Sequence, residues 1–146
     1  MIIIISLILV LDQLTKLIAC RSLYLHQSIP VITNIFHITL VHNRGAAFGL
    51  MRNQVPLLIF TTFIAIWLIY VNLKNSPGGK KLSLYRISLG LVLAGALGNL
   101  IDRVFCGYVI DFLDFRIWPV FNVADSAITV GAILLGWALL KEPKIK

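Results

Sequence analysis

The chain has 146 residues, of which 59% are hydrophobic and 13% are charged, and its formal net charge is +7. Soluble domains carry about 25% charged residues, so the composition indicates an integral membrane protein and argues against a soluble one. The length fits one domain, residues 1–146. The chain has no nucleic-acid-binding motif and its aromatic residues lie inside apolar runs, so we expect no nucleic-acid partner despite the basic charge.

Four apolar segments predict membrane-spanning helices, because each is close to the roughly 20 residues that cross a hydrocarbon core. The expected spans are residues 2–19, 55–73, 84–105 and 120–140. The first segment has no basic residues before it and no small-residue cleavage site after it. We therefore expect a retained span and not a cleaved signal peptide.

Basic residues gather in the segments that connect or follow these spans on one side. Residues 74–86 and 141–146 carry seven lysines and arginines, which is typical of cytoplasmic segments. With four spans, both termini then face the cytoplasm. Residues 20–54 and 106–119 face the other side of the membrane.

The first outer segment has the pattern of β-strands. The side chains of residues 28–50 follow an alternating pattern and include many β-branched ones, and a turn is expected in "NRGAAFG" (43–49). An irregular loop is the alternative. The second outer segment, "GYVIDFLDFRIWP" (107–119), also alternates and could join the same sheet. The expected fold class is a mainly α membrane protein: four transmembrane helices with a small extracytoplasmic β-sheet, or β-cradle, and a loop.

Five aspartates fall in the outer half of the predicted bundle or just outside it, and only Glu142 lies in the cytoplasmic tail. The five are Asp12, Asp102, Asp111, Asp114 and Asp125. Ionisable groups in membrane spans are rare, costly and usually functional. We therefore expect a site at the outer face, although Asp111 and Asp114 could also be solvated loop acids.

Asp12 and Lys16 are four residues apart on the first predicted helix, with the acid first. This spacing places them on one face in the favourable order for an ion pair. We expect a structural role for the pair, with a direct part in the chemistry as the alternative.

On the third predicted helix, Gly95, Asn99 and Asp102 share one small, polar face. Such a face is expected to turn toward the interior of the bundle. Arg103 is the candidate cation for Asp102, because it is adjacent in the sequence. Asp102 could then orient the site through this pair, or act directly in catalysis.

Asn122 and Asp125 begin the fourth span and permit two interpretations. Asn122 is a plausible N-cap, which would place Asp125 at the third helical position, where acids are favoured. Alternatively, no Lys or Arg lies within four residues of Asp125, and such an acid at a membrane interface indicates a functional site. The sequence does not separate the two.

Two aspartates held close together can share one proton, so that one acts as a base on water and the other as an acid on a carbonyl group. This chemistry hydrolyses peptides without a metal. The chain has no H-E-x-x-H pattern, and Ser6 and Ser126 lack a convincing His or Lys partner. The histidines (His26, His37 and His42) are expected at the surface, and Cys20 and Cys106 as small apolar side chains, with a disulfide between them possible. We expect no metal and no cofactor.

Five short segments, in order along the chain, resemble those of lipoprotein signal peptidase, also called signal peptidase II. They are "DQLTK" (12–16), "NRGAAFG" (43–49), "GALGNLIDR" (95–103), "VIDF" (109–112) and "FNVADS" (121–126). They run from the first span to the last. Any one of them would be a weak signal, but five in this order on a frame of four spans make a specific resemblance.

The resemblance implies an intramembrane aspartic peptidase of the bacterial cytoplasmic (inner) membrane. Such enzymes remove the signal peptide of prolipoproteins by cleaving before a diacylglyceryl-modified cysteine. They need no metal, they work among membrane lipids, and cyclic peptides such as globomycin block them. The resemblance places the catalytic pair on Asp111 and Asp125, with Asp102 as a competing choice.

The resemblance also implies supporting roles for other residues. Those expected to hold the substrate or the catalytic pair are Asn43, Gly45, Asn99, Asp102, Arg103 and Asn122. Asp12 and Lys16 would brace the outer β-layer against the first helix.

Two other classes of function fit parts of the sequence. An ion-coupled transporter could use Asp102 and Asp125 as proton carriers, and an assembly factor could use the outer sheet for docking. A transporter usually needs polar groups near the midplane and internal repeats. Here the aspartates gather at one face and no repeat is visible, which favours the peptidase.

Overall fold

The computed structural model describes residues 1–45, 53–75 and 83–141, and its helices agree with the predicted spans to within three residues at each end. The helices are α1 (Ile2–Ser22), α2 (Val55–Asn75), α3 (Leu84–Cys106) and α4 (Val123–Lys141), and the strands are β1 (Ser28–Ile32), β2 (Phe36–Asn43) and β3 (Val109–Asp114). All four helices are long and apolar enough to cross a membrane. The expected fold class is confirmed.

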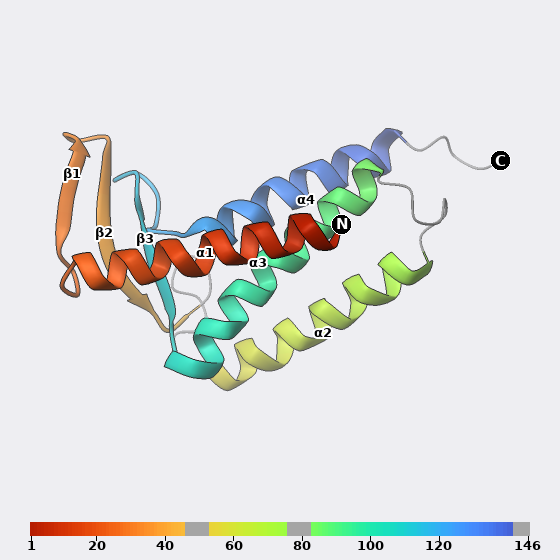
Figure 1. Ribbon diagram of the computed structural model, residues 1–146, viewed down its shortest axis with the longest axis horizontal. Helices are drawn as coiled ribbons and strands as arrows, with labels where there is room; N and C mark the ends of the chain where they lie inside the picture. The colour runs from red at the N-terminus through yellow and green to blue at the C-terminus, as the bar shows by residue number, and fades with distance from the viewer. Residues whose placement is uncertain (46–52, 76–82, 142–146) are drawn as a thin grey trace.

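The sheet lies at one end of the helices (Figure 1). Helices α1, α3 and α4 pack side by side, while α2 packs mainly against α3 and diverges from the others. The ends of the helices that carry Lys74, Arg86 and Lys141 lie away from the sheet. The sheet and these three basic residues therefore lie at opposite ends of the bundle.

The sheet is antiparallel with the order β1-β2-β3, so the second outer segment does join the first. We expected the β segment to reach residue 50, but β2 ends at Asn43. Residues 46–50 lie outside the described part of the chain. Val41 pairs with Asp111, and the register shifts between Ile38 and Val41. One face of the sheet packs its apolar side chains against the C-terminal end of α1 and its C-cap residue, forming a cluster of Ala19, Leu23, Leu40 and Phe112.

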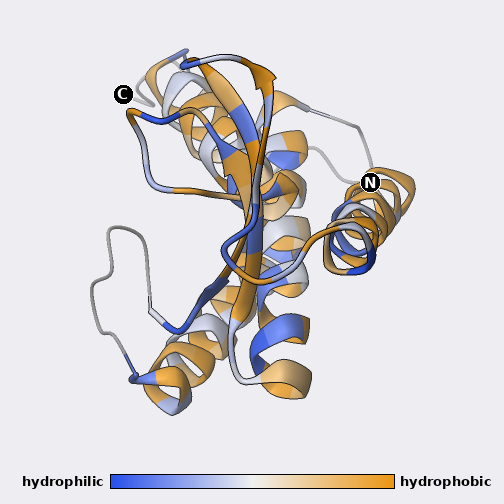
Figure 2. Ribbon diagram, turned by 90° about the vertical axis from the view of Figure 1, so that its left-hand side faces the viewer, coloured by the Kyte–Doolittle hydropathy of each residue, from blue (hydrophilic) through white to orange (hydrophobic). Residues whose placement is uncertain are grey.

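Side chains alternate between the two faces of a strand. Because Phe112 turns toward α1, its neighbour Asp111 turns to the opposite face. On that face, Asn43 donates a hydrogen bond to Asp111. Figure 2 shows the contrast between largely hydrophobic helices and the hydrophilic positions in the strands and the helix ends beside them.

Small residues allow α1, α3 and α4 to approach closely. A Cβ atom at Gly95 would collide with the backbone oxygen of Ala124 in α4. A Cβ atom at Gly98 would lie only 2.5 Å from Oδ2 of Asp12 in α1. These two glycines therefore permit close helix packing, and this packing brings Asp12, α3 and the start of α4 together.

Candidate active site

Asp111 lies on β3 with its side chain turned inward and almost fully buried. Gly107 ends α3 in a left-handed conformation (φ 76°) that glycine adopts without strain, and the chain turns there into β3. The Asp111 carboxylate accepts hydrogen bonds from Nδ2 of Asn122 (2.7 Å) and Nδ2 of Asn43 (2.9 Å). Burial, and next the charge of Asp125, raise the pKa of Asp111 to about 7, although both amides oppose the shift.

Asp125 is the third residue of α4, and Asn122 is the N-cap of that helix. The backbone N–H of Asp125 donates to Oδ1 of Asn122 at 2.8 Å, which is the expected capping bond. The carboxylate of Asp125 accepts a hydrogen bond from Nδ2 of Asn99 at 2.8 Å. The cap is therefore made by Asn122, and the Asp125 carboxylate is left to face α3.

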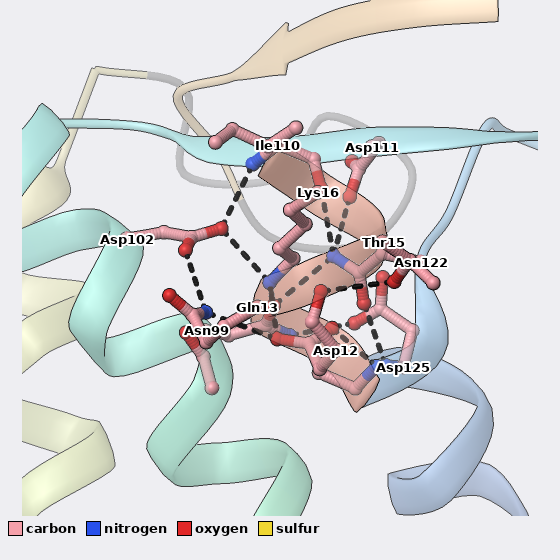
Figure 3. Close-up of polar contacts among 12 residues, drawn as sticks. Asp12, Gln13, Thr15, Lys16, Asn99, Asp102, Ile110, Asp111, Asn122 and Asp125 are labelled. Atoms are coloured by element: carbon pink, nitrogen blue, oxygen red, sulfur yellow. Dashed lines mark hydrogen bonds and ion pairs between the residues drawn. The ribbon is translucent and has the colours of Figure 1, made fainter. Parts of the chain in front are cut away.

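Asn99 and Asn122 connect the two aspartates through side-chain amides (Figure 3). Nδ2 of Asn122 donates to Oδ1 of Asn99 at 3.1 Å, and also to Asp111. Nδ2 of Asn99 donates to Asp125. Asp111 from β3 and Asp125 from α4 thus belong to one hydrogen-bonded network whose links are neutral amides.

Lys16 is buried beside this network and connects α1 with α3. Its Nζ atom lies 2.8 Å from Asp12, 2.8 Å from Asp102 and 3.0 Å from Oδ1 of Asn99. Asp12 in turn accepts a hydrogen bond from the backbone N–H of Ala124, at the start of α4. The predicted Asp12–Lys16 ion pair is present, and it is part of a larger buried cluster.

The cation beside Asp102 was predicted wrongly. Lys16 pairs with Asp102, whereas Arg103 donates to the backbone oxygen of Gly45 at 3.2 Å. Adjacent residues on a helix point in different directions, so Arg103 cannot share the face of Asp102. Asp102 also accepts a hydrogen bond from the backbone N–H of Ile110 in β3 (3.0 Å).

We expected Asp12 and Lys16 to brace the sheet against α1, but neither of them contacts the sheet through a hydrogen bond or ion pair that the described residues show. Asp12 contacts α4, and Lys16 contacts α3. The polar connection from this pair to the sheet runs through Asp102 and its hydrogen bond with Ile110. Direct packing of α1 against the sheet is apolar, through Ala19 and Leu23.

Asn43 and Gly45 lie together where β2 ends. Oδ1 of Asn43 accepts a hydrogen bond from the backbone N–H of Gly45 at 2.9 Å, while its Nδ2 donates to Asp111. This fixes the orientation of the Asn43 amide. The other residues of the "NRGAAFG" turn, 46–49, lie outside the described residues.

Asp114 lies on β3 but has different partners. It forms an ion pair with Arg116 at 2.9 Å and accepts a hydrogen bond from Thr39 at 2.8 Å. Burial raises the pKa of Asp114, but the hydrogen bonds from Thr39 and Arg116 together outweigh it and hold the pKa below its ordinary value. Asp114 is therefore a poor candidate for the proton-carrying member of a pair.

Gln13 belongs to the buried cluster and was missed in the sequence. Its Nε2 atom contacts Asp102 Oδ1 (3.1 Å), Asp12 Oδ2 (3.2 Å) and the backbone oxygen of Gly98 (3.3 Å). Its place beside Asp12 in "DQLTK" was the one available signal. Cys20 and Cys106, expected as small apolar side chains or a disulfide, are exposed free thiols.

The family model described as signal peptidase (SPase) II matches residues 4–141 of the chain. The chain belongs to the signal peptidase II family. A relative from Caldanaerobacter subterraneus, named lipoprotein signal peptidase, is 48% identical over 147 residues, covering 99% of each chain. A relative of the same name from Halothermothrix orenii is 43% identical over 143 residues, covering 98% of this chain and 97% of its own.

A solved structure described as a bacterial membrane enzyme superposes with a TM-score of 0.89 at 34% identity, covering 99% of this chain and 93% of its own. The signal peptidase II family consists of peptidases of the aspartic type, so the chain is a protease with several membrane spans. Family membership therefore decides against the transporter and the assembly factor.

Proposed function

We propose that Asp111 and Asp125 are the catalytic pair with which this signal peptidase II removes the signal peptide of prolipoproteins, cleaving before the diacylglyceryl-modified cysteine. The family supports the reaction. One observation carries the assignment of the pair. Of the five aspartates, all within the described residues, Asp12, Asp102 and Asp114 form ion pairs with Lys or Arg, whereas the catalytic pair contacts neutral amides.

A carboxyl group without a close cation can remain protonated near neutral pH when it is buried beside a second acid. The raised pKa of Asp111 fits this requirement. The pair then holds one proton. The ionised carboxylate accepts a proton from the attacking water, and the protonated group donates its proton to the carbonyl oxygen of the substrate. Collapse of the tetrahedral intermediate breaks the C–N bond, and the amine of the cysteine leaves with a proton returned by the pair.

The neighbouring residues position this pair. Asn43, Asn99 and Asn122 orient the two carboxylates through the hydrogen bonds described above. Arg103 holds the backbone at Gly45, and its charge interacts with both carboxylates of the pair, so we assign it a supporting role toward the substrate. Asp102 supports the site through Lys16 and Ile110, without acting on the substrate.

We place this single domain in the bacterial inner membrane, with both termini in the cytoplasm and the site at the outer face. The separation of the described basic helix ends from the sheet supports this orientation. The substrate is a diacylglyceryl-prolipoprotein embedded among membrane lipids. By family resemblance, cyclic peptides such as globomycin should inhibit the enzyme.

Incubation of the purified protein with a lipidated and an unlipidated precursor tests the proposed function. We expect cleavage of the lipidated precursor only, at the bond before the modified cysteine, with the same rate after treatment with a chelator. Mass spectrometry of the products measures the cleavage position. Equal cleavage of both precursors would refute the proposed specificity, and a loss of activity in the chelator would refute the metal-free mechanism.

The pH dependence of kcat/KM should show an alkaline limb near the pKa of Asp111, about 7. Above this pH Asp111 loses its proton, the pair carries two negative charges and the acid is lost. The hydrogen bond from Asn43 lowers the pKa of Asp111, so Asn43→Ala should move the limb to higher pH. Asp114→Asn is the control and should leave the limb in place. If Asn43→Ala left the alkaline limb where it is in the wild type, the assignment of this limb to Asp111 would be contradicted.

A further inference from the structure

One end of the sheet carries large apolar side chains that the protein leaves exposed. These side chains, which we name the apolar rim, are Val31, Ile32, Ile35, Phe115, Ile117 and Trp118. Ile117 is 93% exposed, and Ile35 and Trp118 are each 58% exposed. Single exposed apolar residues are ordinary, but a contiguous group of this kind marks a surface that contacts a protein or a membrane.

The two halves of the apolar rim come from different segments that the antiparallel register brings together. The β1–β2 turn and the β3–α4 connection lie at the same end of the sheet, since His37 pairs with Asp114. The rings of Phe36 and Phe115 are 4.8 Å apart, and those of Phe115 and Phe121 are 5.9 Å apart. The rim is therefore one surface.

Local backbone structure holds the rim side chains outward. Asn34 and Arg116 both have positive φ angles (63° and 65°), and each directly precedes an exposed isoleucine, Ile35 or Ile117. The backbone N–H of Ile35 donates to Ile32 O, and that of Ile117 donates to Phe115 O. Asparagine adopts a positive φ more readily than most residues, whereas for arginine it is uncommon and costs energy. The exposure of Ile35 and Ile117 therefore results from two hydrogen-bonded turns.

The apolar rim is continuous with the membrane-facing surface of α1. A groove between α1 and the sheet is lined by apolar side chains that include Ile18, Ile29, Ile38 and Phe112. Ile29 in this groove and Val31 at the rim both belong to β1 and are both exposed. The apolar surface thus runs from the exposed side of a spanning helix, across the sheet, to the rim.

The charges at the apolar rim are compatible with a lipid interface. Arg116 lies between Phe115 and Ile117, and it pairs with Asp114 at 2.9 Å. The pairing lowers the cost of bringing either charge near hydrocarbon. Tryptophan favours the boundary between headgroups and acyl chains. The occupant that fits an apolar surface joined to a membrane span, with a tryptophan at its edge, is phospholipid.

We propose that the apolar rim inserts into the outer leaflet, so that the sheet is anchored at its far end by lipid as well as by α1. This rests on the proposed orientation, which places the sheet at the outer face. The polar face of the sheet, with Asn43 and Asp111, then stays free for substrate. The lipid contact sets the depth of β3, and with it the depth of Asp111, relative to the membrane surface.

Fluorescence of a variant that retains Trp118 alone (Trp67→Phe with Trp137→Phe) tests the proposal. The full-length protein is reconstituted into phosphatidylcholine vesicles whose acyl chains carry bromine either near the carbonyl end or near the methyl end. We expect bromine near the carbonyl end to quench Trp118 about twofold more strongly than bromine near the methyl end. Aqueous iodide should quench it weakly. A matched variant that retains Trp67 alone, halfway along α2, should show the opposite preference.

Adding Ile117→Asp to the Trp118 variant should reduce quenching by the brominated lipids and increase quenching by iodide. Strong quenching of Trp118 by iodide from the start, with none by either brominated lipid, would overturn the proposal and leave the rim as a surface for a protein. The fluorescence does not depend on peptidase activity. If Trp118 is quenched but the precursor is not cleaved, the proposed function fails while the lipid contact stands.

Discussion

Lys16→Met is expected to lower the free energy of unfolding by roughly 3–5 kcal/mol, because it removes one partner from a buried ionic cluster. Lys16 is only 1% exposed, and its Nζ atom contacts carboxylates on α1 and α3 at 2.8 Å each. Methionine fills a similar volume without charge. The Asp12 and Asp102 carboxylates would then face each other without a cation. Thermal unfolding in detergent and the yield of monodisperse protein measure the effect.

Asp12→Asn is the matched control on the same helix. Lys16 keeps its contact with Asp102 in this variant, and the asparagine oxygen can still accept the hydrogen bond from the backbone of Ala124. We expect a smaller fall in stability and yield, with normal turnover in the fraction that folds. A wild-type melting temperature for Lys16→Met would contradict the account. Normal yield with lost turnover in Asp12→Asn would place Asp12 in the chemistry.

The elements that depend on local patterns could be predicted from the sequence. The helices follow from the length and apolar character of four segments, because the bilayer demands both. The strands follow from alternation and β-branched residues. The cap of α4 was one of two interpretations of Asn122 and Asp125, because their three-residue spacing is that of one helix turn, but the sequence did not choose between them.

Contacts between distant segments could not be predicted in the same way. Sequence proximity suggested Arg103 as the cation of Asp102, but the partner is Lys16 on another helix. Gln13 carried no signal of its own, and its contacts with α3 exist only because α1 packs there. The turns that expose the apolar rim depend on positive φ angles at Asn34 and Arg116, which are rarely evident in a sequence.

The choice among the aspartates at the sheet end of the bundle shows what the sequence could predict and what it could not. The sequence alone left Asp102, Asp111 and Asp114 as possible partners of Asp125, and resemblance favoured Asp111. The structure distinguishes them by charge: Asp102 pairs with Lys16 and Asp114 pairs with Arg116, while Asp111 contacts two amides. The proposed catalytic pair therefore rests on which acids form no ion pair with Lys or Arg within the described residues, a property of the folded chain.

Asp111→Asn and Asp125→Asn should each lower the cleavage rate by about 10²–10⁴-fold or more, since an amide can neither accept a proton from water nor supply one. Asparagine has nearly the shape of aspartate, and its oxygen can still accept a hydrogen bond from Asn122 or Asn99. Insertion and folding should therefore be retained. Asp114→Asn is the matched control, because Asp114 lies on the same strand as Asp111 but outside the amide network.

The most direct test measures cleavage of one lipidated precursor in detergent by the wild type and these three variants, with the melting temperature of each recorded in parallel. We predict that Asp111→Asn and Asp125→Asn remain folded but leave the precursor intact, while Asp114→Asn cleaves it at a rate close to that of the wild type. Full activity of Asp111→Asn or of Asp125→Asn would contradict the proposed catalytic pair.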